Sequence, residues 1–286
     1  MRVRLCLSSL LLASLLFGQT GTHLYQAMRR RQIGPFRAGR VTAVAGIPGD
    51  AATYYMGTPG GGAWKTVNGG VIWTPIFDQV PTPTSSIGAI QVSLSNPNIV
   101  YVGTGDVSMV GSSVNMGDGV YKSTDAGKTW RHVGLDDTEH IGNMWVDPRN
   151  PDVVLVAALG RTYSRNEQRG VFKTTDGGRS WKKVLYKDDV TGAVDIVFAP
   201  GNSKIGYASL MEHFTQPGAR AAIETSGAAG IYKTTDGGDT WVQLTEGLPG
   251  GSLGRIGVAT NALAGDIGRS HTVPDSPDVC CSSPVG

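Results

Sequence analysis

The sequence predicts an all-β protein that is assembled from repeated four-stranded sheets. Two observations lead to this fold class. Glycine supplies 41 of the 286 residues, about twice its usual ~7 per cent, and glycine breaks helices and provides the positive φ angles of tight turns. In addition, one hairpin-like motif recurs four times along the chain. Apolar residues make up 40% of the chain, which is enough for a hydrophobic core and argues against global disorder.

The recurring motif aligns without gaps in four places. The copies read GAWKTVNGGVIW, GVYKSTDAGKTW, GVFKTTDGGRSW and GIYKTTDGGDTW, and they end at Trp73, Trp130, Trp181 and Trp241. Each copy predicts a hairpin, in which a polar turn side chain accepts hydrogen bonds from turn amides and the tryptophan on the second strand anchors the sheet. The turn positions, to which we assign a structural role like that of the tryptophans, hold Asn68, Asp125, Asp176 and Asp236.

A second pair of predicted strands precedes each hairpin. Two apolar runs joined by a turn rich in Pro, Asn and Asp recur, for example at 90–103 and 144–160. Each repeat therefore has four strands, which we name A to D in chain order. Such repeats are typical of β-propeller blades, whereas a parallel β-helix, the structural alternative, has shorter repeats. We expect about four blades plus one strand at 254–259, and hence an incomplete ring with an open edge.

These motifs resemble a known family. The string Ser/Thr-x-Asp-x-Gly-x-Thr/Ser-Trp is similar to the Asp box of BNR-repeat propellers, which include sialidases, xyloglucanase-type glycosidases, photosystem assembly propellers and sortilin (VPS10) domains. Longer strings, such as GPFRAGRVTAVAG and LTEGLPGGSLGRIGVA, resemble secreted bacterial sortilin-like proteins that are often described as BNR-repeat glycosyl hydrolases. The resemblance covers about residues 33–260. It implies the propeller fold strongly and an activity only weakly.

The chain begins with a predicted secretory signal peptide at residues 1–18. Arg2 and Arg4 precede an apolar run at 5–17, which is shorter than the about 20 residues of a membrane-spanning helix. An uncleaved anchor is the minority alternative. We therefore expect a secreted or periplasmic protein. Its predicted organisation after the signal peptide is a lead-in segment at 19–32, propeller blades at 33–260 and an unrelated or disordered tail at 261–286.

Charge, cysteine and histidine content exclude several function classes. Without the signal peptide the chain has equal numbers of basic and acidic residues, so we expect no bulk electrostatic binding to nucleic acid or to a membrane. Cys280 and Cys281 are adjacent, which does not suit a disulfide framework. The five histidines are scattered without metal-ligand spacing. We expect neither a metal nor another cofactor.

The sequence predicts no catalytic residues. The turn aspartates occupy equivalent positions in successive blades, which places them too far apart for a catalytic carboxylate pair. The resemblance to xyloglucanase-type enzymes implies a catalytic Asp in a first-blade string T-D-V-G-G-A-Y, but the matching string at 58–64 holds Pro59 at that position, and proline has no proton to transfer. A sialidase-type site needs an arginine triad, a base and a tyrosine, and only Arg37 or Arg40 fits one of these positions.

Insertions collect at one end of the predicted blades. The A–B and C–D turns are short, whereas the B–C loops are long in the second, third and fourth repeats, as in repeat proteins that bind ligands through one face. Arg37 and Arg40 belong to a basic stretch before the first blade, which is either a solvated lead-in or a carboxylate-binding site. The candidate binding residues are Arg37, Arg40, Asp106, Asp118, Arg161, Tyr163, Glu167, Arg169, Asp188 and Asp189.

Two functions follow from these observations. The sequence predicts an exported, non-catalytic propeller segment that binds a protein, a peptide or a glycan through its long B–C loops. The alternative is a fragment of a glycoside hydrolase of the xyloglucanase or sialidase type. The open edge of the ring also predicts self-association.

Overall fold

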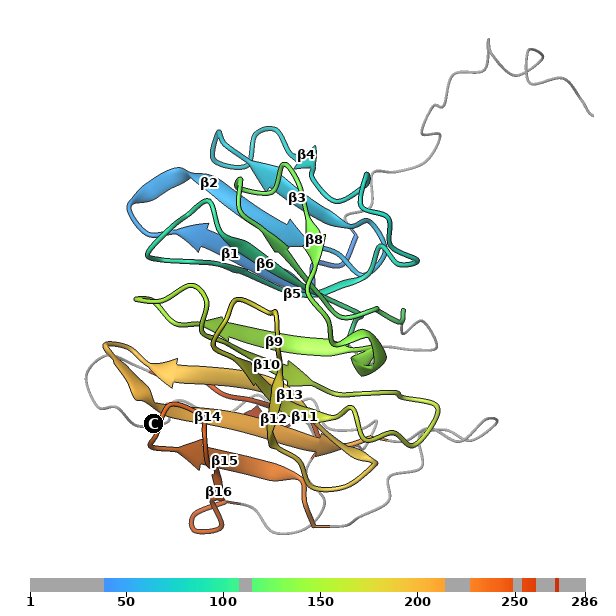
Figure 1. Cartoon of the computed structure of the whole chain (residues 1–286), viewed down its shortest axis with the longest axis vertical. Coiled ribbons are helices and arrows are strands. Elements are labelled where there is room, and N and C mark those ends of the chain that lie inside the picture. Colours follow the sequence, from blue (N-terminus) through green and yellow to red (C-terminus); the bar gives the residue numbers. More distant parts are fainter. Residues whose placement is uncertain (1–38, 108–114, 214–226, 249–253, 261–270, 273–286) are drawn as a thin grey trace, which may run out of the picture. The chain divides into compact units, whose positions relative to one another are not determined.

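The computed structural model describes residues 39–107, 115–213, 227–248, 254–260 and 271–272. All described strands belong to one compact unit that begins at Arg40 (Figure 1). The unit contains four four-stranded sheets and one short strand pair. The predicted signal peptide at 1–18, the lead-in segment at 19–32 and the candidate Arg37 lie outside the described residues.

Every four-stranded sheet is an antiparallel meander in chain order. Sheet 1 contains β1 (Ala43–Ile47), β2 (Asp50–Gly57), β3 (Ala63–Thr66) and β4 (Thr74–Pro75). Sheet 2 contains β5 (Ile87–Val92), β6 (Val100–Thr104), β7 (Val120–Ser123) and β8 (Arg131–His132). A short 3-10 turn, η2 (Asp136–Thr138), connects sheet 2 to sheet 3.

Sheets 3 and 4 repeat this arrangement. Sheet 3 contains β9 (Ile141–Val146), β10 (Val154–Ala158), β11 (Gly170–Thr174) and β12 (Lys182–Leu185). Sheet 4 contains β13 (Thr191–Ala199), β14 (Asn202–Glu212), β15 (Gly230–Thr234) and β16 (Val242–Gln243). The remaining pair is β17 (Ile256–Gly257) with β18 (His271–Thr272). These sheets confirm the predicted fold class, a β-propeller of four-stranded blades.

The sheets stack side by side through their faces. The first strand of each sheet contacts the first strand of the next, in the order β1, β5, β9, β13 and β17. Successive side chains point to opposite faces of a sheet. Because β6 and β10 are buried along their whole length, their apolar side chains fill the space toward both neighbouring sheets. One cluster between sheets 1 and 2 is built around Tyr55, Ile90 and Tyr121. Another cluster, around Leu155, Phe198 and Leu210, joins sheets 3 and 4.

Tyrosine and lysine side chains also join each sheet to the next one along the chain. The Tyr55 hydroxyl and the Lys65 ammonium of sheet 1 both donate to the carbonyl of Ala126 in sheet 2, at 3.3 and 3.0 Å. In sheet 2 the equivalent Tyr101 donates to the Pro151 carbonyl of sheet 3 at 2.8 Å. Because each lysine also lies over the ring of its tyrosine, at 5.2 Å for Lys65 and Tyr55, the pair is held as a unit.

Two of the motif tryptophans, Trp130 and Trp181, bond the preceding sheet, whereas the Trp241 indole donates to Gly238 of its own turn at 3.2 Å. The indole N–H of Trp130 donates to the carbonyl of Ile76 in the preceding sheet, and that of Trp181 donates to Val133, both at 2.7 Å. Each tryptophan lies directly before its fourth strand and not within it, which differs from the sequence expectation. This position at the sheet boundary lets the indole reach the neighbouring sheet.

The meander fixes which connections share an end of the sheets. The A–B and C–D turns lie at one end, which we call the turn end, and the B–C loops and D–A connections lie at the other, which we call the loop end. In Figure 1 the loop end is on the right, where β9 begins. The insertions in the sequence therefore fall at the loop end.

The predicted tail is only partly described. His271–Thr272 pairs with Ile256–Gly257 in an antiparallel register. The prediction of a disordered tail otherwise concerns residues outside those described. Within the described part of the chain, no helix has the length and apolar character to cross a membrane.

Candidate functional site

The turn end uses its polar groups within each turn. The Asp176 carboxylate accepts the Thr174 hydroxyl at 2.8 Å, the amides of Arg179 and Ser180 at 2.9 and 3.0 Å, and the Ser180 hydroxyl at 2.6 Å. The same pattern surrounds Asp236 and, with fewer bonds, Asn68. Hydrogen bonds from Thr129 and Ser123 lower the pKa of Asp125 to about 2. These side chains therefore hydrogen-bond to groups of their own turns and stabilise them.

At the loop end, Asp118 joins three segments of sheet 2 and its surroundings. Its carboxylate accepts hydroxyl hydrogen bonds from Thr82 at 2.9 Å and Tyr121 at 2.6 Å, and its amide donates to the Thr104 hydroxyl oxygen at 2.8 Å. Burial, assisted by the bond to Asp118, raises the pKa of Tyr121 to about 12. Since Asp118 bonds the 82 segment, the start of the B–C loop at Thr104 and Tyr121 of β7, the geometry gives it a role in positioning the loop.

Arg169 is buried at the loop end of sheet 3. Its guanidinium donates to the carbonyls of Leu159 at 2.9 Å, Val190 at 3.2 Å and His213 at 3.1 Å. It also donates to Ser164 at 3.1 Å and to Arg161. Burial lowers the pKa of Arg169 to about 10. The side chain therefore holds the 159–164 loop, the connection at Val190 and the end of β14 together, and this is a positioning role.

Two histidines are buried beside Arg169. Nδ1 of His140 lies 3.0 Å from the carbonyl oxygen of Gly160, and no described residue pairs with its Nε2. Burial lowers the pKa of His140 to about 4. Burial, with the nearby positive charge of Arg169, lowers the pKa of His213 to about 4 as well. Both imidazoles are therefore neutral near pH 7.

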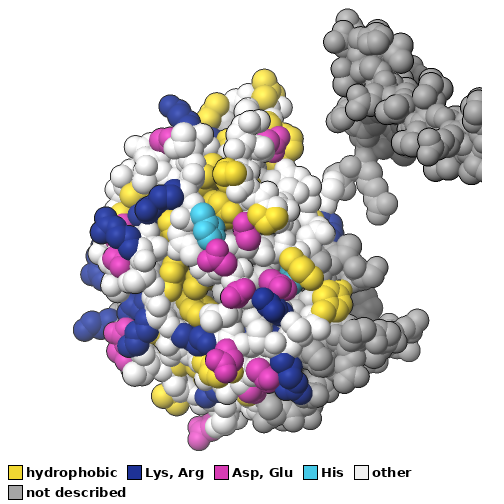
Figure 2. Space-filling view, turned by 45° about the vertical axis from the view of Figure 1, so that its right-hand side comes forward, with side chains coloured by type: hydrophobic (Ala, Val, Ile, Leu, Met, Phe, Trp, Pro, Cys, Tyr) yellow, Lys and Arg dark blue, Asp and Glu magenta, His cyan; other side chains and the backbone are white. Residues whose placement is uncertain are grey.

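Exposed charges of both signs form the surface of these loops. Arg161 lies 3.1 Å from Asp137 and 3.2 Å from Glu139, and Arg165 lies 2.8 Å from Asp189. Burial raises the pKa of Glu139, and the charge of Arg161 opposes that rise. Figure 2 brings this side of the molecule forward and shows acidic and basic side chains close together, with a histidine among them.

Two exposed tyrosines belong to the same loops. Tyr163 is 41% exposed and Tyr186 is 38% exposed. The Lys183 ammonium lies 4.4 Å from the Tyr186 ring centroid and donates to the carbonyl of Glu167. Asp188 accepts the amides of Val190 and Thr191 at 3.0 and 2.6 Å. Aromatic faces flanked by charges are typical of surfaces that bind polar ligands.

A separate cavity lies where the first strands of several sheets begin, and we call it the inner pocket. It has a volume of about 350 Å³ and is lined by Arg40, Thr42, Gly88, Asp106, Gly142 and Arg255, among others. Arg40 lies 3.3 Å from Asp106, whose side chain is only 2% exposed. Arg255 donates to the Val107 carbonyl at 3.3 Å. The structure thus brings together Arg40 and Asp106, which the sequence analysis named separately.

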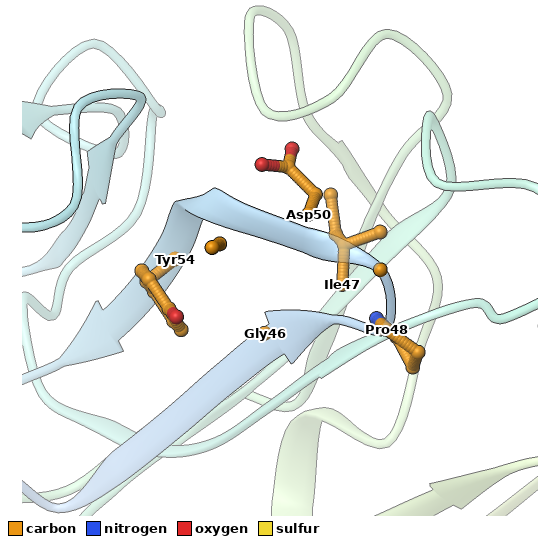
Figure 3. Close-up of a pocket in the computed structure, with 7 residues that line it drawn as sticks. Gly46, Ile47, Pro48, Asp50 and Tyr54 are labelled. Atoms are coloured by element: carbon orange, nitrogen blue, oxygen red, sulfur yellow. The ribbon is translucent and has the colours of Figure 1, made fainter.

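Two further hollows lie toward the turn end. One, of about 450 Å³, surrounds the A–B turn of sheet 1, where the ring of Tyr54 lies near Gly46 (Figure 3). Asp50, also visible there, accepts the amides of Ala52 and Thr53 at 2.8 and 3.2 Å. The other, of about 500 Å³, is lined largely by apolar residues that include Val44, Leu94, Trp145 and Phe198. Neither hollow combines a cavity with several charged groups.

Sequence reasoning missed several residues of the loop end. Arg165, Tyr186, His140 and Arg255 were not among the candidates, although a signal for Arg255 exists. An Ile-Gly pair recurs at 87–88, 141–142 and 256–257, at the starts of β5, β9 and β17. The residue before this pair therefore lies at the loop end near the inner strands.

The described residues hold no group of three or more His, Cys, Asp or Glu side chains placed for a metal ion. At the position where the xyloglucanase-type string would have its Asp, the structure has Pro59, whose carbonyl accepts the side-chain amide of Asn115. At this point of the B–C loop of sheet 1, the polar group is thus a backbone carbonyl and not a carboxylate.

Comparisons with known proteins support the propeller assignment. The family model Sortilin-Vps10, described as sortilin, neurotensin receptor 3, matches residues 118–253. A xyloglucanase from a Paenibacillus species is 26% identical over 232 residues, which are 71% of this chain and 21% of the relative. A xyloglucanase from Acetivibrio thermocellus is 27% identical over 231 residues, which are 71% of this chain and 25% of the relative. The chain spans about a fifth to a quarter of these curated relatives.

Solved structures agree on the fold. The structure of an ancestral GH74 enzyme matches with a TM-score of 0.57 and 24% identity over 77% of this chain and 27% of that chain. The GH74 xyloglucanase from Xanthomonas campestris matches with a TM-score of 0.54 and 19% identity over 76% of this chain and 32% of that chain. The chain is therefore similar to β-propeller proteins of the sortilin and GH74 types.

Proposed function

We propose that this chain is part of an exported propeller that binds a polysaccharide at its loop end, and that the described blades bind the glycan without cleaving it. The observation that carries the proposal is the asymmetry of the blades. Long loops, the exposed Tyr163 and Tyr186 and paired exposed charges lie at the loop end, while the turn Asp and Asn side chains of the opposite end bond groups of their own turns. Ligand-binding loops on a rigid repeat scaffold have this distribution.

Polysaccharide is the ligand class that the exposed side chains fit best. A sugar ring has apolar faces and a rim of hydroxyls, so it is bound by an aromatic side chain flanked by charged hydrogen-bonding groups. Tyr163 and Tyr186 supply such rings beside the Arg165–Asp189 pair. The similarity to curated xyloglucanases supports a glycan over a protein or peptide ligand.

Hydrolysis by a longer protein is the second candidate. The similarity to xyloglucanases over 71% of the chain favours it. The proline at position 59, where the resemblance implies a catalytic Asp, argues against hydrolysis by these blades. Asp118 is held by the hydroxyls of Thr82 and Tyr121, which supports a positioning role for this carboxylate.

The test combines binding with a reaction assay. The full chain is passed over immobilised xyloglucan and a panel of other neutral and acidic polysaccharides, and released reducing sugar is measured in parallel. We expect retention on at least one polysaccharide and no release of reducing ends. Release of reducing ends that is lost in a loop-end carboxylate variant would favour the hydrolase, and absence of retention on every polysaccharide would refute the proposed function.

A further inference from the structure

The inner pocket combines a buried ion pair with a second arginine. Asp106 is almost fully buried, and its carboxylate lies 3.3 Å from the Arg40 guanidinium, which is 39% exposed. The buried carboxylate thus fixes the direction of an arginine that still reaches the cavity. The amide of Asp106 donates to the Asn115 carbonyl at 3.1 Å, which holds the 105–107 segment in place.

Arg255 reaches the same cavity from the segment before β17. The next residue, Ile256, is buried, while Arg255 itself is exposed. Among the described residues its guanidinium has one hydrogen bond, to the Val107 carbonyl at 3.3 Å. Since a guanidinium carries five N–H donors, Arg255 retains donors for a ligand.

Glycines on the pocket wall let the first strands of neighbouring sheets approach each other closely. Gly88 and Gly142 lie at register irregularities of β5 and β9. A Cβ on Gly88 would lie 2.0 Å from the Ile141 carbonyl oxygen, and one on Gly142 would lie 2.2 Å from that of Val194. Side chains are therefore excluded from this wall, and β-bulges at such positions often accompany binding sites.

The charges of the pocket favour an anion. Two guanidinium groups line it, whereas the one carboxylate there is buried and paired with Arg40. Guanidinium groups bind carboxylates through parallel charge-assisted hydrogen bonds. The cavity volume of about 350 Å³ is at the lower end of the range of ligand sites, which suits one ring of a longer ligand.

We propose that the inner pocket binds the carboxylate of a uronic-acid residue, with Arg255 as the principal donor and Arg40, oriented by Asp106, as the second. This inference rests on the proposed polysaccharide function and makes it more specific: the glycan is acidic. An acidic peptide also carries carboxylates, so the test includes one as a competing ligand.

The test compares a charged oligosaccharide with its uncharged methyl ester. Calorimetry measures binding of the full chain to a galacturonic-acid trisaccharide and to its fully methyl-esterified form at low salt. We expect the acid to bind and the ester to bind at least about tenfold more weakly, because charge-assisted hydrogen bonds are lost. Equal affinity for the two forms, or binding of a hexaglutamate peptide in preference to the trisaccharide, would overturn the proposal.

Variants locate the interaction. Arg255→Gln is expected to weaken binding of the acid about tenfold to a hundredfold and to leave binding of the ester unchanged. Arg255→Lys, which keeps the charge, is expected to recover part of the loss. Arg149→Gln is the control, since Arg149 is highly exposed in the A–B turn of sheet 3. Acid affinity in Arg255→Gln equal to that of the unaltered chain would refute the pocket.

The outcomes separate this inference from the proposed function. If neutral xyloglucan is retained by the chain and the acid trisaccharide does not bind, the polysaccharide function stands and the inner-pocket proposal fails. If the acid trisaccharide binds through Arg255 and no polysaccharide is retained, the pocket stands and the proposed function fails.

Discussion

The two ends of the four sheets are stabilised by different kinds of contact. At the turn end, a hydroxyl two residues before the turn Asp or Asn donates to that side chain in all four sheets, at 2.8 to 2.9 Å. At the loop end one contact recurs, from the Thr58 hydroxyl to the Gly62 carbonyl and from Thr104 to Gly119 in sheets 1 and 2. The others belong to one sheet each: Thr82 and Tyr121 donate to Asp118, Arg169 donates to five carbonyls, and Arg40 pairs with Asp106. The turn end is thus uniform, and the loop end is mostly specific to each sheet.

We infer from this difference that the turn end shapes the scaffold and that the loop end carries the proposed binding surface. Four turns with the same hydroxyl-to-turn-side-chain bond give the sheets a similar geometry. The loop end uses buried polar groups to hold long connections in one arrangement, which leaves exposed side chains such as Tyr163 and Tyr186 in defined positions. A binding surface requires that order, because flexible side chains lose entropy on binding. Variants at the two ends should therefore have different consequences.

The largest effect is expected for Arg169→Met. The substitution removes the donor to five carbonyls that are otherwise enclosed by the loops. We expect the free energy of unfolding to fall by about 3–5 kcal/mol, as measured by urea denaturation. The control Arg149→Met changes an exposed arginine and should cost less than about 0.5 kcal/mol. A loss below about 1 kcal/mol for Arg169→Met would contradict its positioning role.

Acidification should affect the loop end before the turn end. The folded-state pKa of His140 and of His213 is about 4, below the ordinary value of about 6.5. As the pH falls from about 6.5 to 4, the unfolded chain takes up protons that the folded chain does not, so stability is lost in this window, by roughly 3 kcal/mol per histidine. Arg169 faces both imidazoles, and the Asp106 carboxylate acts on His140.

The turn aspartates lose their contribution at lower pH. Their folded-state pKa is depressed, to about 2 for Asp125, so the stability they provide is present above about pH 4 and is lost as the pH falls toward 2.

Urea denaturation at pH 7, 5.5 and 4.5 measures the loss of stability that is expected from His140 and His213. His140→Gln should flatten the slope there, and His132→Gln should not. An unchanged slope in His140→Gln would show that this imidazole does not carry the effect.

Substitutions in the turns should lower the free energy of unfolding less than Arg169→Met does. Equivalent substitutions in different sheets should lower it by the same amount. The Thr174 hydroxyl donates to Asp176 at 2.8 Å and accepts the Gly178 amide at 3.0 Å, and Thr234 does the same toward Asp236 and Gly238 at 2.8 and 2.9 Å. Thr174→Val and Thr234→Val should each lower the free energy of unfolding by about 1–2 kcal/mol, because the amide loses its acceptor. Values that differ by more than about 1 kcal/mol would argue against uniform turns.

The same contrast explains what the sequence could predict. The turn contacts join residues at most four apart, as between Asp176 and Ser180, so the repeat motif contains all of their partners. The loop-end contacts join distant residues: Arg169 reaches His213, 44 positions away, and Arg255 reaches Val107, 148 positions away. A repeat motif carries no information about such partners, because they belong to segments that differ between sheets.

The sequence also did not predict which charged side chains are buried. Arg161 and Arg169 are both arginines of one B–C loop, yet the first pairs with Asp137 at the surface and the second is buried among carbonyls. The tyrosine and lysine that join sheet 1 to sheet 2 also escaped notice, although a lysine stands at the same position in all four motif copies. Their role depends on the neighbouring sheet, which the motif itself does not contain.

The most direct test of the account measures glycan affinity for one variant at each end. Tyr163→Ala combined with Tyr186→Ala removes two exposed rings at the loop end, whereas Tyr54→Ala removes a ring that is 40% exposed beside the A–B turn of sheet 1. On the polysaccharide that retains the unaltered chain, we predict at least about tenfold weaker binding for the loop-end variant and unchanged binding for Tyr54→Ala. Equal binding by the loop-end variant and the unaltered chain, or loss of binding in Tyr54→Ala alone, would contradict the account.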